Sequence, residues 1–290
     1  MLSINFIGCG KLGKTLGFLL QHQRVATIGG IINTSLDSAQ QACEFIGAGT
    51  AQMSLDKLPS ADLTFIAVPD DHIKTVADRV ANGASLKPGS IFVHCSGFLP
   101  ADVMAALQQK GYLIASAHPM CSFADPNLSI QSYPGTYCAI EGDAAALPTI
   151  ERLFQGIGSI TYRVNASQKG LYHAAGVFAS NYLVSLNSIA AQCLIDAGVS
   201  PDTAQQVIAR LMQVTLQNLE KTGCPKKSLT GPIKRGDCNT VAGHLASLSN
   251  DRHRRAYQQL GLEALSLSDL SDERAAAINE ILQHQSAEKI

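Results

Sequence analysis

Net charge is the first thing this sequence lacks. Its 290 residues include 22 Lys or Arg and 23 Asp or Glu, which gives a formal net charge of −1. Proteins that bind nucleic acid or an anionic membrane through electrostatics carry a basic excess, and this composition contains none. We therefore expect no nucleic-acid or membrane partner, whereas a small, anionic ligand held by local charge stays open.

Long apolar runs and paired cysteines are also missing. No stretch of about 18 apolar residues occurs, so no transmembrane helix is predicted. The eight cysteines form no CxxC pair and no zinc-finger spacing, so the sequence predicts no metal site. We interpret them as reduced, mostly buried thiols of a cytoplasmic protein.

Short β-branched runs alternate with helical patterns through the first half of the chain. This alternation is typical of βαβ units, and six or more strands would form a doubly wound parallel sheet. The expected strands cover residues 3–8, 25–33, 63–69, 90–97, 112–120, 137–143 and 159–164.

Strand signals stop after about residue 163, and helical periodicity follows. The expected helices cover residues 167–197, 201–222, 239–248, 252–265 and 271–285. At about 150 residues per domain, the length suits two domains. We predict an α/β, Rossmann-like domain over residues 1–163 and an all-α domain over residues 164–290, which carries substrate-binding residues and forms a homodimer.

A glycine motif lies between the first expected strand and the first expected helix. It reads Gly8-Cys9-Gly10-Lys11-Leu12-Gly13, which is G-x-G-x-x-G. The first glycine permits a tight turn, the second lets the backbone approach a pyrophosphate, and the third allows close contact between helix and strand. Since the helix N-terminus faces the anion, we predict a dinucleotide site with these six residues as ligands.

The end of the second expected strand bears on the choice between NAD and NADP. An Asp or Glu at this position forms hydrogen bonds with the ribose hydroxyls of NAD, but this chain has Asn33-Thr34-Ser35. Neutral hydrogen-bonding side chains suit a 2′-phosphate, with Lys11 close enough in sequence to help. We predict NADP(H), although the arginine often found at this position is missing and Asp37 follows closely.

Two further strand ends are expected at the edge of the sheet where ligands bind in open α/β folds. Val68-Pro69 ends one strand and Ser96-Gly97 follows another. We expect these residues to line the nicotinamide.

Acidic residues and histidines near the same edge have more than one interpretation. We interpret Asp70-Asp71 mainly as the N-terminal cap of the following helix. His94 and His118 each end a strand, where a histidine is more often structural than catalytic, and a site role stays open for both.

The segment KGLYHAAGVFASN, residues 169–181, reads as an apolar helix that carries two proton-handling groups one turn apart. At about 100° per residue, one narrow stripe holds Lys169, His173, Gly176, Ser180 and Asn187. Lys169 at solvent and His173 on a backbone carbonyl would be the structural interpretation. The position directly after the nucleotide domain and the space at Gly176 favour a ligand-facing stripe instead.

The segment LTGPIKRGD, residues 229–237, concentrates Gly, Pro, Thr, Arg and Asp in a loop between helices. Loops of this composition often position ligands. Arg235 would either clamp a substrate carboxylate or pair with Asp237 on the surface, and both alternatives stay open.

Several of these segments together resemble a known family. The segments are GCGKLG, ADLTFIAVPDDHI, HCSG, HPMCSF, KGLYHAAGVFASN and LTGPIKRGD. The whole chain resembles the NAD(P)-dependent β-hydroxyacid dehydrogenase superfamily, in which a Rossmann domain precedes a helical domain led by a catalytic-lysine helix. More narrowly, it resembles bacterial proteins that pair a Rossmann-like domain with a once-uncharacterised C-terminal domain.

Proteins of this branch include an alternative class of ketopantoate reductase, which supplies pantoate for coenzyme A synthesis. The resemblance implies an NADP-dependent oxidoreductase that reduces 2-dehydropantoate to pantoate. In the superfamily the helix reads K-x-x-x-N, where the lysine moves a proton and the asparagine orients the substrate. This chain has Lys169-x-x-x-His173 with Asn181 further on, so either Lys169 or His173 would give the proton.

The hypothesis also assigns residues that would contact the substrate. They are Ser96, His118, Ser180, Thr230, Arg235 and Asp237, and Asn181, which would orient the substrate, is assigned to the catalytic residues with Lys169 and His173. Other interpretations are a reductase or dehydrogenase similar to pyrroline-5-carboxylate reductase or prephenate dehydrogenase, and a noncatalytic NADP sensor.

Overall fold

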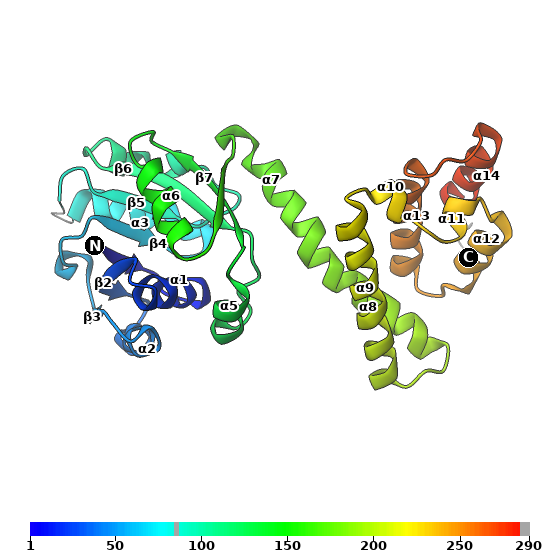
Figure 1. Cartoon of the computed structure of the whole chain (residues 1–290), viewed down its shortest axis with the longest axis horizontal. Helices are drawn as coiled ribbons and strands as arrows, with labels where there is room; N and C mark the ends of the chain where they lie inside the picture. Colours follow the sequence, from blue (N-terminus) through cyan, green and yellow to red (C-terminus); the bar gives the residue numbers. More distant parts are fainter. Residues whose placement is uncertain (84–86, 285–290) are drawn as a thin grey trace. The chain divides into compact units, whose positions relative to one another are not determined.

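The computed structural model describes residues 1–83 and 87–284. The chain divides into two compact units, Met1–Ser180 and Asn181–Ile290 (Figure 1). Across the described residues, no helix has both the length and the hydropathy that a bilayer span requires.

The N-terminal unit is built on one eight-stranded sheet with the order β3-β2-β1-β4-β5-β6-β7-β8. The strands are β1 (Leu2–Ile7), β2 (Ala26–Ile32), β3 (Thr50–Gln52), β4 (Leu63–Ile66), β5 (Ile91–His94), β6 (Leu113–Pro119), β7 (Tyr137–Gly142) and β8 (Ile160–Arg163). The predicted doubly wound, Rossmann-like sheet is confirmed. Its order reverses between β1 and β4, which is where open α/β sheets form a ligand crevice.

The last two strands run against the other six, which the sequence does not predict. β1 to β6 are parallel, β7 is antiparallel to β6, and β8 is parallel to β7. A strand that is buried on both faces reads as an apolar run in either direction, so its pattern does not encode its direction. The reversal pairs Ser116 of β6 with Glu141 of β7.

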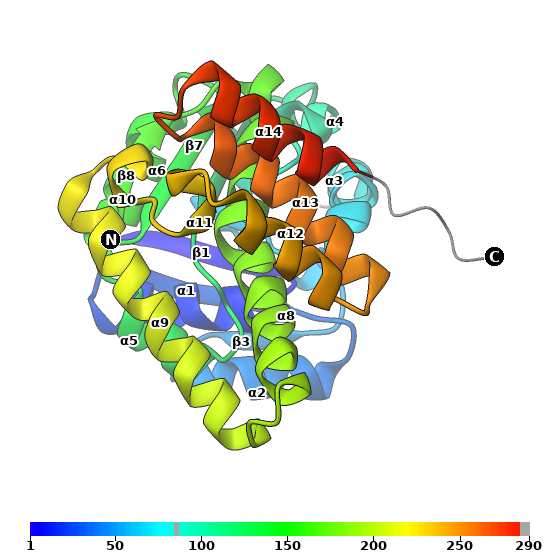
Figure 2. The same ribbon diagram turned by 90° about the vertical axis from the view of Figure 1, so that its right-hand side faces the viewer.

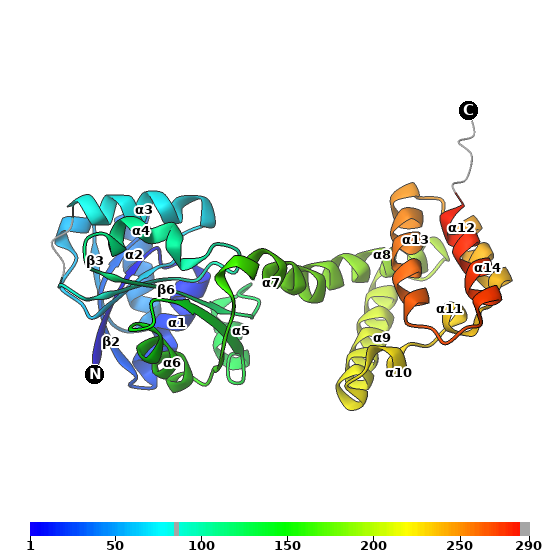
Figure 3. The same cartoon turned by 90° about the horizontal axis from the view of Figure 1, so that it is seen from above.

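Helices cover both faces of this sheet. The first face packs against α1 (Lys11–His22), α2 (Leu36–Ile46), α5 (Pro126–Ser132) and α6 (Leu147–Gly156). The second packs against α3 (Asp70–Gly83) and α4 (Ala105–Gln108), and Figure 3 shows α3 and α4 on the side opposite α6. Short 3₁₀ turns lie at Leu55–Lys57, Ala101–Met104 and Ala166–Gln168.

The last helices complete the chain. They are α7 (Lys169–Gly176), a π-helical turn (Val177–Asn181), α8 (Tyr182–Asp196), α9 (Pro201–Thr222), α10 (Pro225–Ser228), α11 (Pro232–Arg235), α12 (Cys238–Ser247), α13 (Asp251–Ser266) and α14 (Asp272–Gln283). The prediction of an all-α region after β8 is confirmed. In the C-terminal unit, α8 packs on α9 and α13 lies beside α14 (Figure 2).

The boundary between the two compact units does not coincide with the point in the sequence where strand patterns give way to helical ones. β8 ends at Arg163, where the sequence predicts the domain boundary. The N-terminal unit continues through α7 to Ser180, and Lys169, at the start of α7, has only 2% of its surface exposed. The whole of α7 therefore belongs to the same compact unit as the sheet.

Candidate functional site

The glycine turn after β1 has the geometry that a pyrophosphate needs. Gly8 has a φ of 82°, and a Cβ there would lie 2.7 Å from the Ala67 carbonyl oxygen, so only glycine fits. A Cβ on Gly10 would meet no atom within 4 Å, which leaves its backbone open to a ligand. No side chain caps the N-terminus of α1, so its backbone N–H groups are available to an anion.

The third glycine and its neighbour hold the turn in place. A Cβ on Gly13 would lie 3.1 Å from Sγ of Cys9, and Leu12 packs against the apolar core on this face of the sheet. Their predicted part in the cofactor site is thus to position the turn, because neither residue lines the cavity above it.

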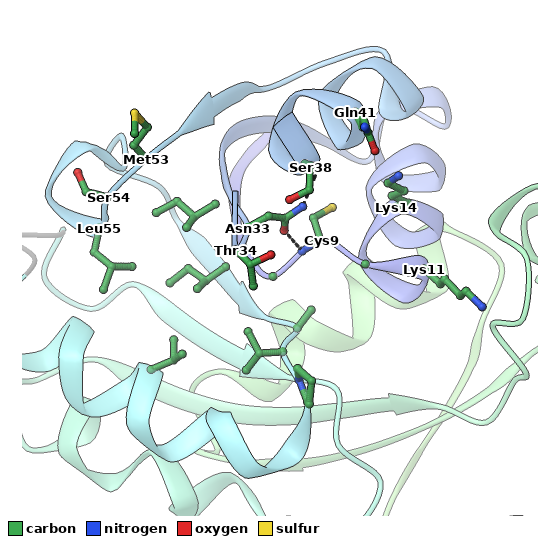
Figure 4. A pocket seen from close by; sticks show the side chains of 18 of the residues that line it. Cys9, Lys11, Lys14, Asn33, Thr34, Ser38, Gln41, Met53, Ser54 and Leu55 are labelled. Carbon is green, nitrogen blue, oxygen red and sulfur yellow. Dashed lines mark hydrogen bonds between the residues drawn. The ribbon is translucent and has the colours of Figure 1, made fainter. Parts of the chain in front are cut away.

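A cavity of about 770 Å³ opens over this turn, at the point where the strand order reverses. Eight of the residues predicted as cofactor ligands line it, namely Gly8, Cys9, Gly10, Lys11, Asn33, Thr34, Val68 and Pro69. Ser54 and Leu55 lie at another part of the wall (Figure 4). Its size suits a small-molecule ligand.

Asn33 is a structural brace in this cavity. Its Oδ1 accepts a hydrogen bond from the Cys9 backbone N–H at 2.5 Å, and its Nδ2 donates to the Ser38 carbonyl at 2.9 Å (Figure 4). Ser35 caps α2, because its side chain accepts from the Ser38 N–H. Thr34 and Ser38 line the cavity, whereas Ser35 does not.

Three basic side chains, Lys11, Lys14 and Arg79, line the cavity, and none of the described residues in its wall carries a carboxylate. Asp37 is not in the wall, and its carboxylate accepts a hydrogen bond from Nε2 of Gln41 at 2.8 Å. This wall of the cavity therefore favours an anion.

Lys14 was not singled out by the sequence. Its ammonium lies 5.9 Å from the ring centroid of Phe45, between α1 and α2. Figure 4 shows Lys14 and Gln41 on the same side of the cavity, whereas Lys11 points away from Thr34. Lys14, one turn after Lys11, therefore lies on the side of the cavity that α1 and α2 form.

Ser96, after β5, organises the loop at the carboxyl edge of the sheet. Its hydroxyl donates to Oδ2 of Asp70 at 2.7 Å and accepts from the backbone N–H groups of Phe98 and Leu99. Asp70 is the first residue of α3 and lies within its first turn, not before the helix as a cap, and its carboxylate holds this serine. Neither Ser96 nor Gly97 lines the 770 Å³ cavity.

Lys169 is buried against three neighbouring strands. Its Nζ donates to the Ser96 carbonyl at 2.9 Å and to Oγ of Ser116 at 2.5 Å, and it lies 3.4 Å from Oε1 of Glu141. Glu141 is 7% exposed, and the same oxygen accepts the Ala101 N–H at 2.8 Å. Burial lowers the pKa of Lys169 and raises that of Glu141, while their attraction opposes both changes.

The two strand-end histidines have different surroundings. His94 is fully buried, with Nε2 3.1 Å from the Pro100 carbonyl and Nδ1 accepting the Ser96 N–H at 3.1 Å. Burial lowers its pKa to about 3, so we interpret it as structural. In His118, Nδ1 lies 2.7 Å from the Tyr172 hydroxyl, and burial, with the charge of Lys169, lowers the pKa to about 4.

His173 faces His118 across Gly97. The two imidazole centroids are 6.1 Å apart, and the Phe98 ring lies 6.5 Å from His173. A Cβ on Gly97 would lie 2.7 Å from Cδ2 of His173 and 2.9 Å from Nε2 of His118. The glycine therefore makes room for both rings, and the N-terminal unit brings Ser96, Gly97, His118, Lys169 and His173 together.

The predicted polar stripe does not continue beyond Gly176. Residues 177–181 form a π-helical turn, in which the rotation per residue is smaller than in an α-helix. The regular count of about 100° per residue therefore fails at Ser180, Asn181 and Asn187. Asn187 instead accepts a hydrogen bond from Gln205 at 2.9 Å.

The predicted substrate contacts in the C-terminal unit lie around α11. Nε of Arg235 donates to Oδ2 of Asp237 at 2.9 Å, and both side chains are well exposed. The surface pair that the sequence allows is thus formed, without a buried contact for either charge. Thr230 precedes α11, whose N-cap Gly231 has a φ of 94°.

Sequence reasoning missed two kinds of residue. Lys14 and Arg79 lie on helices, where a half-buried or exposed basic side chain looks like an ordinary solvated charge. Glu141 gave a clearer signal, because it is an acidic residue in an otherwise apolar strand, and a buried carboxylate needs a partner.

Comparisons with known proteins agree with this architecture. Residues 1–119 match a family model described as a Rossmann-like domain, and residues 136–264 match one described as a domain of unknown function, DUF2520. The first model ends with β6, and the second begins just before β7. No curated protein matches the sequence.

Solved structures of similar fold span the whole chain. Protein TM1727 from Thermotoga maritima is 29% identical, with 97% of this chain and 98% of that chain covered and a TM-score of 0.65. The pyrroline-5-carboxylate reductase of Streptococcus pyogenes is 17% identical, with 97% and 96% covered and a TM-score of 0.59. A Plasmodium falciparum pyrroline carboxylate reductase with NADP bound is 11% identical, with 97% and 98% covered and a TM-score of 0.60.

Proposed function

We propose that this chain is an NADP(H)-dependent oxidoreductase that transfers a hydride between NADPH and a small 2-oxo or 2-hydroxy acid. The first substrate to test is 2-dehydropantoate (ketopantoate), which would be reduced to pantoate. The proposal rests on one observation above all, the cavity over the glycine turn, which has three basic side chains and no carboxylate among its described lining residues.

The described residues of the cavity fit the cofactor. The turn at Gly8 and Gly10 and the N-terminus of α1 would hold the pyrophosphate. Thr34 and Ser38, with Lys14 nearby, would hold the 2′-phosphate, for which an acidic residue would be unfavourable. When bound, the nicotinamide supplies a hydride.

The proton chemistry would come from the cluster at the ends of β5 and β6. Lys169 and His173 are the two proton donors that the sequence proposes, and His118 lies beside His173. Asn181, Thr230 and Arg235 are retained as substrate-orienting residues on the strength of the family resemblance, with Ser96, Ser180 and Asp237. Arg235 would have to exchange its partner Asp237 for a substrate carboxylate.

Reduction of an imine is the second candidate. It is supported by the pyrroline carboxylate reductases of similar fold, which align over nearly the full length of this chain. The same glycine turn and the same proton-handling cluster would serve either substrate, because a C=O and a C=N bond both accept a hydride at carbon and a proton at the heteroatom.

We further propose a cytoplasmic homodimer. All eight cysteines are unpaired, which is usual in a reducing compartment. In the C-terminal unit the exposed apolar side chains include Val184, Val207, Leu211 and Leu216. Sedimentation or light scattering would test the dimer, which predicts twice the monomer mass at micromolar concentration.

The activity is tested by following NADPH oxidation with ketopantoate, other 2-oxo acids and pyrroline-5-carboxylate. Fluorescence titration with NADPH and NADH measures cofactor binding independently. We expect tighter binding of NADPH and turnover of a 2-oxo acid, whereas turnover of pyrroline-5-carboxylate alone would support the imine candidate. Tight NADPH binding without turnover, together with a change of oligomeric state, would support the NADP sensor.

A further inference from the structure

The four basic side chains near Gly97 differ in how many of their nitrogen atoms already have hydrogen-bond partners in the protein. These are the buried Lys169, the buried His94, and the half-buried His118 and His173. A group that gives a proton to a substrate needs an N–H that no protein acceptor already holds.

Lys169 has no such donor. An ammonium group has three N–H bonds, and three acceptors surround this one: the Ser96 carbonyl, Oγ of Ser116 and Oε1 of Glu141, at 2.9, 2.5 and 3.4 Å. Its side chain is 2% exposed. For a substrate to take a proton from Lys169, one of these buried contacts would have to break, leaving a buried polar group unsatisfied.

His94 is excluded by the same count, because the Pro100 carbonyl and the Ser96 N–H occupy its two ring nitrogens. His118 has one nitrogen engaged, since Nδ1 lies 2.7 Å from the Tyr172 hydroxyl. Its Nε2 is directed toward the space above Gly97.

His173 is different from the other three. The rings of Phe98 and His118 lie beside it, together with Gly97, and no hydrogen bond to either of its nitrogens occurs within the described residues of the N-terminal unit. The titratable groups around it are His118 from β6 and, on its own helix, Lys169 and Tyr172. The loop after β5 contributes Phe98, which carries no charge.

We propose that His173 is the catalytic residue that exchanges a proton with the substrate, and that Lys169 is a positioning residue that never gives its proton to the substrate. The proposal deepens the proposed function and rests on it. In the direction of ketone reduction, the carbonyl carbon gains the hydride and its π electron pair moves to oxygen. The N–H bond of the His173 imidazolium then breaks, an O–H bond forms, and a neutral imidazole remains.

The geometry also gives Lys169 a defined task. By joining the Ser96 carbonyl to β6 and β7, it fixes the turn on which Gly97 lies and thus the space between the two imidazoles. Its charge disfavours protonation of His118. A neutral His118 would orient the substrate oxygen through Nε2 and leave the proton transfer to His173.

The experiment compares His173→Gln with a variant that removes the whole buried ion pair, Lys169→Met with Glu141→Gln. Turnover is measured across pH with whichever substrate of the panel the wild type reduces. We expect His173→Gln to lower kcat roughly 100- to 10,000-fold and to abolish the pH dependence of kcat that a single proton donor produces. The double variant should keep that pH dependence, and kcat should fall by no more than about 100-fold, because only the placement of the loop is disturbed.

Chemical rescue provides a second readout. In His173→Ala, free imidazole should restore part of the turnover, because the space beside Gly97 can accept a ring. The exposed His72 of α3 supplies the matched control, and His72→Gln should behave as the wild type. NADPH titration and the melting temperature show that each variant is folded and binds cofactor.

The two hypotheses fail in different ways. A wild-type protein that binds NADPH but reduces no substrate of the panel overturns the proposed function. If the wild type turns over and His173→Gln matches His72→Gln, the assignment of His173 is wrong. It is also wrong if the folded double variant loses its pH dependence while His173→Gln keeps it.

Discussion

Lys169 and Glu141 form a buried ion pair, with 3.4 Å between Nζ and Oε1 and less than a tenth of either side chain exposed. Removing one partner of such a pair leaves the other charge uncompensated, which typically costs about 3 to 5 kcal/mol. We therefore expect Lys169→Met to lower the free energy of unfolding by that amount in urea denaturation, and Lys169→Met with Glu141→Gln to recover most of it.

The exposed pair between Lys74 and Asp78 is the matched control for this prediction. Lys74→Met should change the free energy of unfolding by less than about 1 kcal/mol, because surface pairs contribute little. Equal effects of Lys169→Met and Lys74→Met would contradict the burial of the first pair.

The buried histidines predict acid sensitivity. Burial lowers the pKa of His118 from 6.5 to about 4 and that of His94 to about 3, so between these values and 6.5 the unfolded chain binds more protons than the folded one. Stability from this source is complete above pH 6.5 and falls as pH is lowered toward 4, by at most about 1.4 kcal/mol per pH unit for each histidine.

Urea denaturation at a series of pH values measures this slope. His118→Gln should have a shallower slope than the wild type between pH 4 and 6.5, since one of the two groups is gone. His72→Gln, at an exposed position, should reproduce the wild-type slope. An unchanged slope in His118→Gln would contradict the burial of that imidazole.

The basic side chains of the cavity predict cofactor preference. Lys14→Gln should weaken NADPH binding roughly 10- to 100-fold, which corresponds to one charged hydrogen bond, and should change NADH binding little. Arg79→Gln tests the other wall of the cavity in the same way. Lys74→Gln, on α3 but outside the lining residues, is the control in fluorescence titrations.

Gly97 predicts a steric effect on turnover. The Cβ of Gly97→Ala would lie within 3 Å of both imidazoles, so the rings must move. Because displacements of about 1 Å can lower catalysis roughly 100-fold, kcat should fall by that order while NADPH affinity is retained. Gly170→Ala is the control, since its Cβ would lie 3.6 Å from Phe98, an ordinary contact. Equal kcat values for the two variants would contradict the role of Gly97.

The sequence was sufficient for the features that are local in the chain. The glycine turn, the alternation of strands and helices, and the all-α region after Arg163 each follow from patterns within about 20 residues. For the same reason the sequence placed Lys169 and His173 on one helix. It could not show that Lys169 points into the sheet, because its acceptors at 96, 116 and 141 are distant in sequence.

The cofactor cavity shows the same limit. The position of Asn33 after β2 predicts a ligand, and Asn33 does line the cavity, but the sequence does not show that its amide also braces Cys9 against Ser38. Lys14 and Arg79 come from helices on opposite faces of the sheet, and only the folded chain brings both to one cavity. Whether a polar side chain at the end of a strand bonds to the protein or to a ligand depends on tertiary contacts, and the sequence around that strand does not show them.

The reversal of β7 has a consequence for how the chain can be divided. It places Glu141 opposite Ser116, and the only cation within reach of that carboxylate in the described residues of the unit comes from Lys169. A polypeptide that stopped at Arg163 would contain every strand of the sheet but not the ammonium group that neutralises Glu141. We therefore expect the smallest fragment that folds on its own to extend past β8 into α7. During synthesis, Glu141 has no cationic partner until that helix has left the ribosome.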